Sequence, residues 1–192
     1  MNARRLYGPV VLAILAAGGA VVLTASRPWG TATVRGTGVP QDAVTASGNQ
    51  AVPVVAALGV VIVTAALAVL ATRGRWRRAV GGLVVLLGLT TAVLAASAQG
   101  ATLDALDRLV AESPSFTGTN HPEDVAVTWW RCLTVLSGVV AATLGVLVVR
   151  WAAAWPVMGG RYDAPGRARG DQAVDADEDL WKALDDGRDP TE

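Results

Sequence analysis

Residues 73–101 read RGRWRRAVGGLVVLLGLTTAVLAASAQGA. Four arginines occupy the first six positions, and 25 uncharged residues then separate Arg78 from Asp104. A helix needs roughly 18 or more consecutive apolar residues to cross a bilayer. The stretch therefore predicts a transmembrane helix over residues 79–101, preceded by a strongly basic loop.

Three more uncharged blocks accompany this one: 21 residues between Arg5 and Arg27, 30 between Asp42 and Arg73, and 18 between Arg131 and Arg150. They predict spans at residues 6–26, 51–72 and 132–149. The expected fold is an all-α integral membrane protein, with four transmembrane helices in residues 1–151 and a tail over residues 152–192. Because 52% of the residues are hydrophobic and only 17% are charged, the composition excludes a water-soluble globular enzyme. A formal net charge of zero gives no basis for nucleic-acid binding.

The arginines also predict an orientation, because basic residues resist translocation across an energised membrane. The N-terminus, the short second loop and the tail carry 12 basic residues, whereas the other two loops carry 4. We therefore expect a multi-pass protein of the plasma membrane with both termini in the cytoplasm and loops 27–50 and 102–131 outside. One alternative stays open: the first span resembles a secretory signal peptide, although it exceeds the usual apolar length of about 7–15 residues, and its cleavage would leave three spans.

Aromatic residues gather beside the predicted span ends. Six of the seven tryptophans lie there: Trp29, Trp76, Trp129, Trp130, Trp151 and Trp155. Since tryptophan is enriched at membrane–water interfaces, we interpret them as aromatic belts. The single cysteine, Cys132, excludes an intramolecular disulfide and a cysteine-based zinc site. We expect it to be a small buried residue at the start of the last span.

Small residues recur at every fourth position in two of the predicted spans. The third span has Gly88, Ala92, Ala96 and Gly100, and the fourth has Ser137, Ala141 and Gly145. Residues at this spacing share one helix face, and small side chains let helix backbones approach closely in lipid. We expect the two faces to pack against each other, either within one chain or across a homo-oligomer.

The predicted spans contain no Asp, Glu, Lys, Arg or His, and their polar groups are mostly threonine and serine hydroxyls. Coupled transporters and proton relays usually place ionisable groups inside the membrane, so the sequence disfavours such a carrier. A hydroxyl-lined path through an oligomer stays open. His121, Glu123 and Asp124 offer three metal-ligand types on one loop, but without the fixed geometry that a metal site needs. We expect no catalytic residue, no cofactor and no metal.

The two loops expected outside the membrane carry some structural signal. The first, over residues 28–50, favours a short extended pair. The second begins with apolar residues that are spaced as one face of a helix, namely Leu103, Leu106, Leu109 and Val110. This helix is predicted either to lie on the membrane surface or to cap the bundle.

The tail changes character along its length. Residues 164–175 are poor in bulky apolar side chains and are typical of a flexible linker. Residues 176–186 predict a short amphipathic helix, whose acidic start suits the helix dipole. Its apolar stripe is formed by Leu180, Trp181 and Leu184. An exposed tryptophan on such a helix favours docking into a partner's groove, with folding back onto this protein as the open alternative.

Three segments of the sequence resemble one known family. They read ASRPW at residues 25–29, WPVMGGRYD at 155–163, and DLWKALD at 179–185 followed by DPT at 189–191. These segments are similar to hallmarks of the actinobacterial tryptophan-operon-associated membrane proteins, and the resemblance covers nearly the whole chain with the same four-span order. It implies an association with tryptophan biosynthesis and supplies no catalytic residue.

Together these observations predict a membrane anchor or regulatory scaffold that docks a cytosolic protein through its tail and is not an enzyme. The alternative is a component for transport of tryptophan or a related aromatic metabolite, using hydroxyl groups and interfacial tryptophans. A membrane enzyme has the least support, because no convergent set of polar groups is visible.

Overall fold

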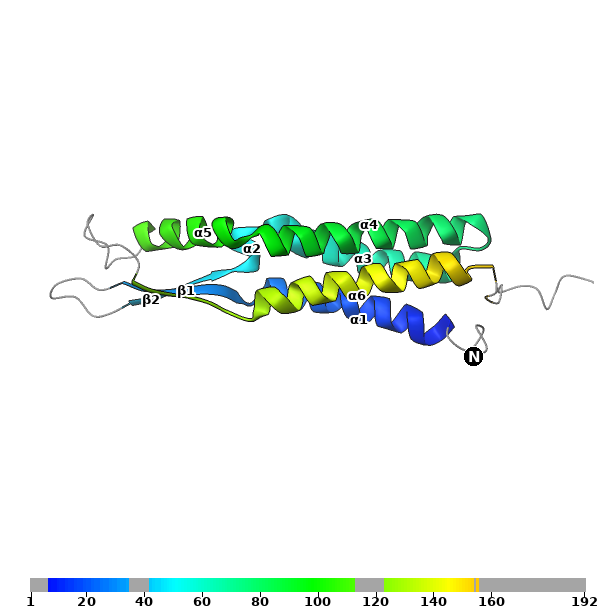
Figure 1. Cartoon of the computed structure of the whole chain (residues 1–192), viewed down its shortest axis with the longest axis horizontal. Helices are drawn as coiled ribbons and strands as arrows, with labels where there is room; N and C mark the ends of the chain where they lie inside the picture. Colours follow the sequence, from blue (N-terminus) through cyan, green and yellow to red (C-terminus); the bar gives the residue numbers. More distant parts are fainter. Residues whose placement is uncertain (1–6, 35–41, 113–122, 154, 156–192) are drawn as a thin grey trace, which may run out of the picture. The chain divides into compact units, whose positions relative to one another are not determined.

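The computed structural model describes residues 7–34, 42–112, 123–153 and 155. Four of its helices are long and apolar enough to cross a membrane: α1 (Tyr7–Ala25), α3 (Pro53–Ala71), α4 (Arg75–Ser97) and α6 (Trp130–Trp151). They run side by side as a bundle (Figure 1). The prediction of a helical membrane protein with four spans is thereby confirmed.

Local sequence explains where these helices begin and end. Pro53 occupies the first turn of α3, where its missing N–H leaves no hydrogen bond unmade. Gly74 joins α3 to α4 with a φ of 61°, a left-handed conformation that glycine adopts without steric cost. At the other end, α4 stops at Ser97 and a new helix, α5 (Gln99–Glu112), starts after Ala98. The helix of the third span is thus shifted from the predicted residues 79–101 and includes three of the four arginines of the basic loop.

The bundle is assembled from two helix pairs. α4 packs mainly on α6, and α1 packs mainly on α3, while contacts of α1 with α6 and of α3 with α4 close the ring. Glycines bring each pair together. A Cβ atom added at Gly18 would lie 3.0 Å from the backbone oxygen of Gly59, and one added at Gly145 would lie 2.9 Å from that of Gly81. Such close approach is how helices associate in lipid, where apolar area alone gives no driving force.

Buried positions alternate between three and four residues apart along all four spans. The series are Val11, Ile14, Gly18, Val21 and Ala25; Val55, Gly59, Ile62, Ala66 and Val69; Arg77, Gly81, Val84, Gly88, Thr91, Ala95 and Ala98; and Thr134, Gly138, Ala141, Gly145, Val148, Ala152 and Trp155. Each series therefore repeats every seven residues. This is the repeat of left-handed helical bundles, in which helices cross at about 20°.

A small antiparallel sheet continues the molecule beyond one end of the bundle. It contains β1 (Pro28–Val34), β2 (Asp42–Ser47) and β3 (Glu123–Val127), in the order β2-β1-β3. Thr31 of the central strand pairs with Thr45 on one side and with Ala126 on the other. The extended pair predicted in the first loop is confirmed, and β3 adds a third strand that the sequence did not predict.

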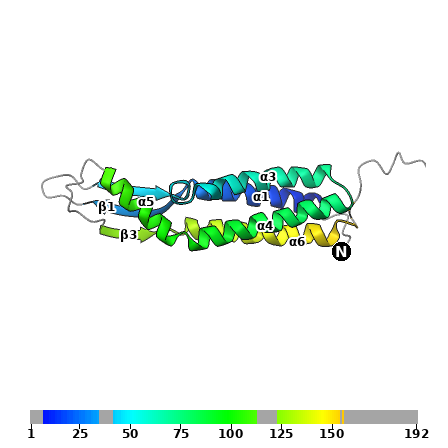
Figure 2. The ribbon, with the colours of Figure 1, turned by 90° about the horizontal axis from the view of Figure 1, so that it is seen from above.

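Two helices complete this end of the molecule, which we call the sheet end. α2 (Gly48–Ala51) starts with a capping box between Ser47 and Gln50. α5 lies across one face of the sheet (Figure 2). Its buried Leu106 meets Gly30, where an added Cβ would lie 3.0 Å from the Leu106 Cδ1 atom. The helix predicted for this segment is present, and it packs on the sheet and on α2 and not across the end of the bundle.

One expectation about the start of α6 is wrong. Cys132 is exposed and not buried. The inward-facing series of α6 begins at Thr134, and a residue two positions earlier lies on nearly the opposite side of a helix. Cys132 therefore faces outward from the bundle.

Candidate functional site

At the sheet end, a fully buried tryptophan joins the bundle to the sheet. Trp29 has no exposed surface, and its indole N–H donates a hydrogen bond of 3.0 Å to the carbonyl oxygen of Thr24. Its ring lies against Gly48, where an added Cβ would be 2.6 Å from the ring atom Cζ2. The interpretation of Trp29 as a belt residue is therefore wrong. Thr24 belongs to α1 and Gly48 begins α2. The position of Trp29 just after a predicted span therefore did not indicate that these two segments enclose it.

Hydroxyl groups of two threonines bridge α1 and α6 near this tryptophan. The Thr134 Oγ1 donates to Thr24 Oγ1 over 2.8 Å, and Thr24 Oγ1 in turn donates to the carbonyl oxygen of Ala20 over 2.7 Å. Thr91 on α4 donates to the carbonyl oxygen of Leu87 over 2.8 Å. These buried hydroxyls are thus satisfied by the helices themselves, as is common for threonine in a helix.

The opposite end of the bundle carries arginines, and we call it the Arg-rich end. It comprises Arg73, Arg75, Arg77, Arg78 and Arg150. One of them, Arg77, is only 2% exposed. Its Nε donates to the carbonyl oxygen of Thr72 over 3.0 Å, and its guanidinium lies 5.1 Å from the ring centre of Tyr7. A hydrogen bond and a cation–π contact thus accompany the burial of this charge.

The same tyrosine holds the last described residue of the chain. Tyr7 and Trp155 meet edge to face with ring centres 5.2 Å apart, and the Tyr7 hydroxyl donates to the carbonyl oxygen of Val69 over 3.4 Å. Trp155 is 3% exposed, and among the described residues its indole N–H finds no acceptor. Trp155 is therefore also a core residue and not a belt residue. We call Tyr7, Arg77 and Trp155 the Tyr7 cluster; it joins α1, α4 and α6 where the chain leaves the bundle.

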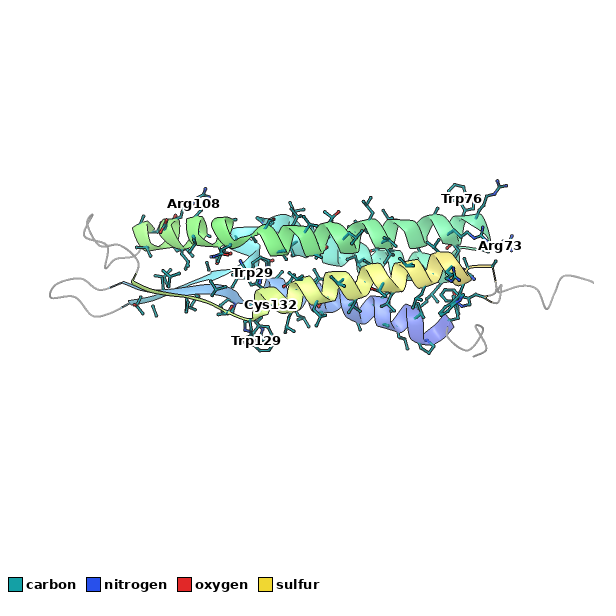
Figure 3. The ribbon with its side chains drawn as sticks, viewed as in Figure 1. Trp29, Arg73, Trp76, Arg108, Trp129 and Cys132 are labelled. Carbon is teal, nitrogen blue, oxygen red and sulfur yellow. The ribbon has the colours of Figure 1, made fainter. Side chains whose placement is uncertain are left out.

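Two other tryptophans beside span ends are exposed. Trp76 at the Arg-rich end is 73% exposed and Trp129 at the sheet end is 62% exposed. Figure 3 shows both side chains directed away from the helices. Trp129 stacks on Trp130 with ring centres 4.5 Å apart, and the Arg27 guanidinium lies 5.4 Å from the centre of the Trp130 ring.

Of the four small residues expected to pack against the fourth span, two face α6 and two do not. An added Cβ at Gly88 would lie 2.6 Å from the Ala142 backbone nitrogen on α6, and Ala92 borders Gly138 in the same contact. In contrast, Ala96 is exposed, and an added Cβ at Gly100 would meet nothing within 4 Å. Within one chain these two residues are not part of the contact. Steps of four residues advance about 40° around a helix each time, so the expected series turns away from the partner.

On α6, the expected residues lie nearer the contact. Ala141 and Gly145 are buried, whereas Ser137 is half-buried and donates through Oγ to the carbonyl oxygen of Leu133 over 2.8 Å. The neighbouring Gly138 faces α4 in its place. The seven-residue spacing of Gly81 with Gly88, and of Gly138 with Gly145, is the signal that could have identified the contact.

Several predicted positions lie outside the described residues. They are the docking residues Leu180, Trp181 and Leu184, together with His121 of the loop considered for metal binding. Within the described ranges, no three His, Cys, Asp or Glu side chains are grouped so that they could hold a metal ion.

One comparison identifies the family of this chain. Residues 11–191 match the model of the family described as tryptophan-associated transmembrane protein. No curated protein and no solved structure matches the chain. The matched range contains most of α1, all of the other three spans, and all three segments on which the resemblance was based. The chain therefore belongs to the family of tryptophan-associated transmembrane proteins.

Proposed function

We propose that this protein is a membrane anchor or regulatory scaffold, and that its tail recruits a soluble protein of tryptophan biosynthesis. In this proposal both termini face the cytoplasm from the plasma membrane. Leu180, Trp181 and Leu184 form the apolar stripe that enters the partner's groove. The protein has no catalytic role and binds no cofactor.

The close packing of the bundle supports this proposal most strongly. Each helix pair approaches through glycines, and added Cβ atoms at Gly88 and Gly138 would collide with backbone atoms of the opposite helix. The buried positions of the spans carry apolar residues, glycines and bonded threonines, with Arg77 at one end. An interior of this kind suits anchoring, so specificity is expected in the segments outside the membrane.

The alternative, transport of tryptophan or a related metabolite, has less support. A path for such a solute needs polar groups that are free to face it. The buried hydroxyls of Thr24, Thr91 and Thr134 are engaged with backbone carbonyls or with each other. Uptake and efflux of labelled tryptophan should therefore be equal in host cells with and without the gene.

The Tyr7 cluster gives the tail a fixed starting point. Trp155 is packed against Tyr7, which also contacts Arg77, so the chain leaves the bundle beside the first turn of α4. Twenty-four residues separate Trp155 from Leu180. A flexible segment of this length has a root-mean-square reach of roughly 25–30 Å, which would hold a docked partner close to the membrane.

Co-purification tests the proposal. We would tag the full chain at its N-terminus in the native host, extract it in mild detergent, and quantify enzymes of tryptophan biosynthesis by targeted mass spectrometry. The double substitution Trp181→Ala and Leu184→Ala should reduce recovery of the partner by roughly 30-fold or more, as expected for loss of a hot spot worth about 2 kcal/mol.

A matched control is available on the same end of the bundle. Trp76→Ala removes a tryptophan that is 73% exposed and lies outside the tail, and it should leave recovery unchanged. Equal recovery of every such enzyme with the wild-type chain and the double variant would contradict the docking proposal. Equal membrane abundance of all three chains must accompany the comparison.

A further inference from the structure

Charge is distributed unevenly between the two ends of the described structure. Its acidic residues all belong to the sheet end: Asp42, Asp104, Asp107, Glu112, Glu123 and Asp124. The Arg-rich end has five arginines and, among the described residues, no acid. Four of the five are exposed, namely Arg73, Arg75, Arg78 and Arg150. This end therefore presents a concentrated positive surface.

Three of the exposed arginines lie together on the turn between α3 and α4. Arg73 precedes Gly74 in that turn, and Arg75 and Arg78 are three residues apart on the first turn of α4, so they share one face. The first turn of α4 contains no acid. Positive side chains at the N-terminus of a helix are opposed by its dipole, so an external anion would relieve an unfavourable arrangement.

The position of this turn identifies the source of the anion. The apolar helix α3 ends at Ala71, and α4 is uncharged after Arg78, so the arginines occupy the boundary between two membrane spans. Trp76 stands between Arg75 and Arg77 and is 73% exposed, as expected for a side chain at the depth of lipid headgroups. Figure 3 shows Arg73 and Trp76 together at the end of the molecule opposite Arg108.

We propose that an anionic phospholipid binds at the α3–α4 turn, with its phosphate held by Arg73, Arg75 and Arg78 and its glycerol region beside Trp76. Guanidinium groups bind phosphate oxygens through paired, charge-assisted hydrogen bonds. At the sheet end, the Arg27 guanidinium lies over the Trp130 ring, and Arg108 shares α5 with Asp104, Asp107 and Glu112, so acidic residues accompany the positive charge there. The binding surface belongs to the α3–α4 turn, independently of what the tail binds.

Lipid retention measures this proposal directly. The full chain is reconstituted in nanodiscs of mixed phosphatidylcholine and phosphatidylglycerol, and the ratio of the two lipids retained on the protein is determined by native mass spectrometry. The wild type should be enriched in phosphatidylglycerol. The triple substitution Arg73→Gln, Arg75→Gln and Arg78→Gln should weaken binding by roughly 100-fold, since each basic residue near an anionic surface contributes about a fivefold factor.

Two further variants and one titration distinguish lipid binding by these three arginines from misfolding, from an effect of any exposed arginine, and from binding of a free anion. The corresponding triple lysine variant keeps the charges but not the paired guanidinium hydrogen bonds, so it should retain more phosphatidylglycerol than the glutamine variant and less than the wild type. An unchanged monodisperse fraction of the triple glutamine variant shows that it does not merely misfold. Arg108→Gln should retain it as the wild type does. Equal enrichment in the wild type and the triple glutamine variant overturns the proposal, as does an equal loss in Arg108→Gln. A rise in thermal stability produced by inorganic phosphate and not by phosphatidylglycerol would also overturn it, because the ligand would then be a free anion.

Discussion

The two ends of the bundle each contain one buried tryptophan, and they hold it differently. Trp29 at the sheet end is enclosed by α1 and α2, and its indole N–H is hydrogen-bonded to Thr24. Trp155 at the Arg-rich end is held by an aromatic edge contact, and its N–H has no acceptor among the described residues. Among the described residues, Trp29 is therefore held by a hydrogen bond as well as by packing, whereas Trp155 is held by ring contacts and packing.

Disrupting the bundle between the two ends should have the largest effect. Leucine in place of Gly88 would collide with the backbone of Gly138 and Ala142, so α4 and α6 must separate. We expect Gly88→Leu to prevent recovery of folded protein, measured as the monodisperse fraction after detergent extraction. Gly100→Leu is the matched control, since an added Cβ there meets nothing within 4 Å, and it should fold normally. Normal folding of Gly88→Leu would contradict the close contact of α4 with α6 at this position.

Removing the tryptophan of the sheet end should have the next largest effect. Trp29→Ala would leave a large cavity between bundle and sheet and should lower the free energy of unfolding by about 3–5 kcal/mol. Denaturant titration in mixed micelles measures this change. Trp129→Ala, which removes a tryptophan that is 62% exposed at the same end, should change stability by well under half of that amount. Equal losses would show that Trp29 does not join the sheet to the bundle.

Phenylalanine distinguishes the two tryptophans most sharply. Trp29→Phe removes the donor to the Thr24 carbonyl, whereas Trp155→Phe removes a donor that has no acceptor in the described structure. Both changes lose similar volume, so Trp29→Phe should cost about 1–3 kcal/mol more than Trp155→Phe in the same titration. A reversed order would indicate that the Trp155 indole N–H donates a hydrogen bond that contributes more to stability than that of Trp29.

The smallest expected effect concerns the hydroxyl bridge near the sheet end. Thr134→Val keeps the shape of the side chain but removes its hydrogen bond to Thr24, and hydrogen bonds between membrane helices contribute about 0.6 kcal/mol on average. We expect a loss of that size by denaturant titration. Thr143→Val is the control, because its exposed hydroxyl bonds only to Val139 of the same helix. Equal losses in both variants would leave the interhelical bridge without a measurable role.

The spans could be predicted because the signal for them is local. An uncharged block of sufficient length identifies each membrane helix, whatever the rest of the chain does. The blocks did not show that α4 begins inside the basic loop, because Arg77 is accommodated by Thr72 and Tyr7, which no hydropathy pattern reveals. Nor did a four-residue pattern of small side chains show which of them face the partner helix, since Ala96 and Gly100 share it with Gly88.

The sheet end shows why contacts between distant segments escape this kind of prediction. β3 pairs with β1 across a sequence separation that includes four helices, and its five residues carry no turn signal linking them to β1. Trp29 looks like a belt residue from its position after a span, and only the approach of Gly48 encloses it. Both features depend on where the chain returns to the same place, which local composition does not encode.

The seven-residue repeat of buried positions gives each membrane helix a rotational phase. One residue inserted between Gly81 and Leu87 would turn everything beyond it by about 100°, carrying Gly88 away from α6 and the bulky Leu87 into its place. Seven inserted residues would restore the phase but lengthen the helix by about 10 Å, more than a bilayer accommodates without strain. The spans therefore do not tolerate insertions that a surface loop would tolerate. In α4, this constraint fixes the rotation and the distance of the arginines at its start relative to α5, which follows its other end.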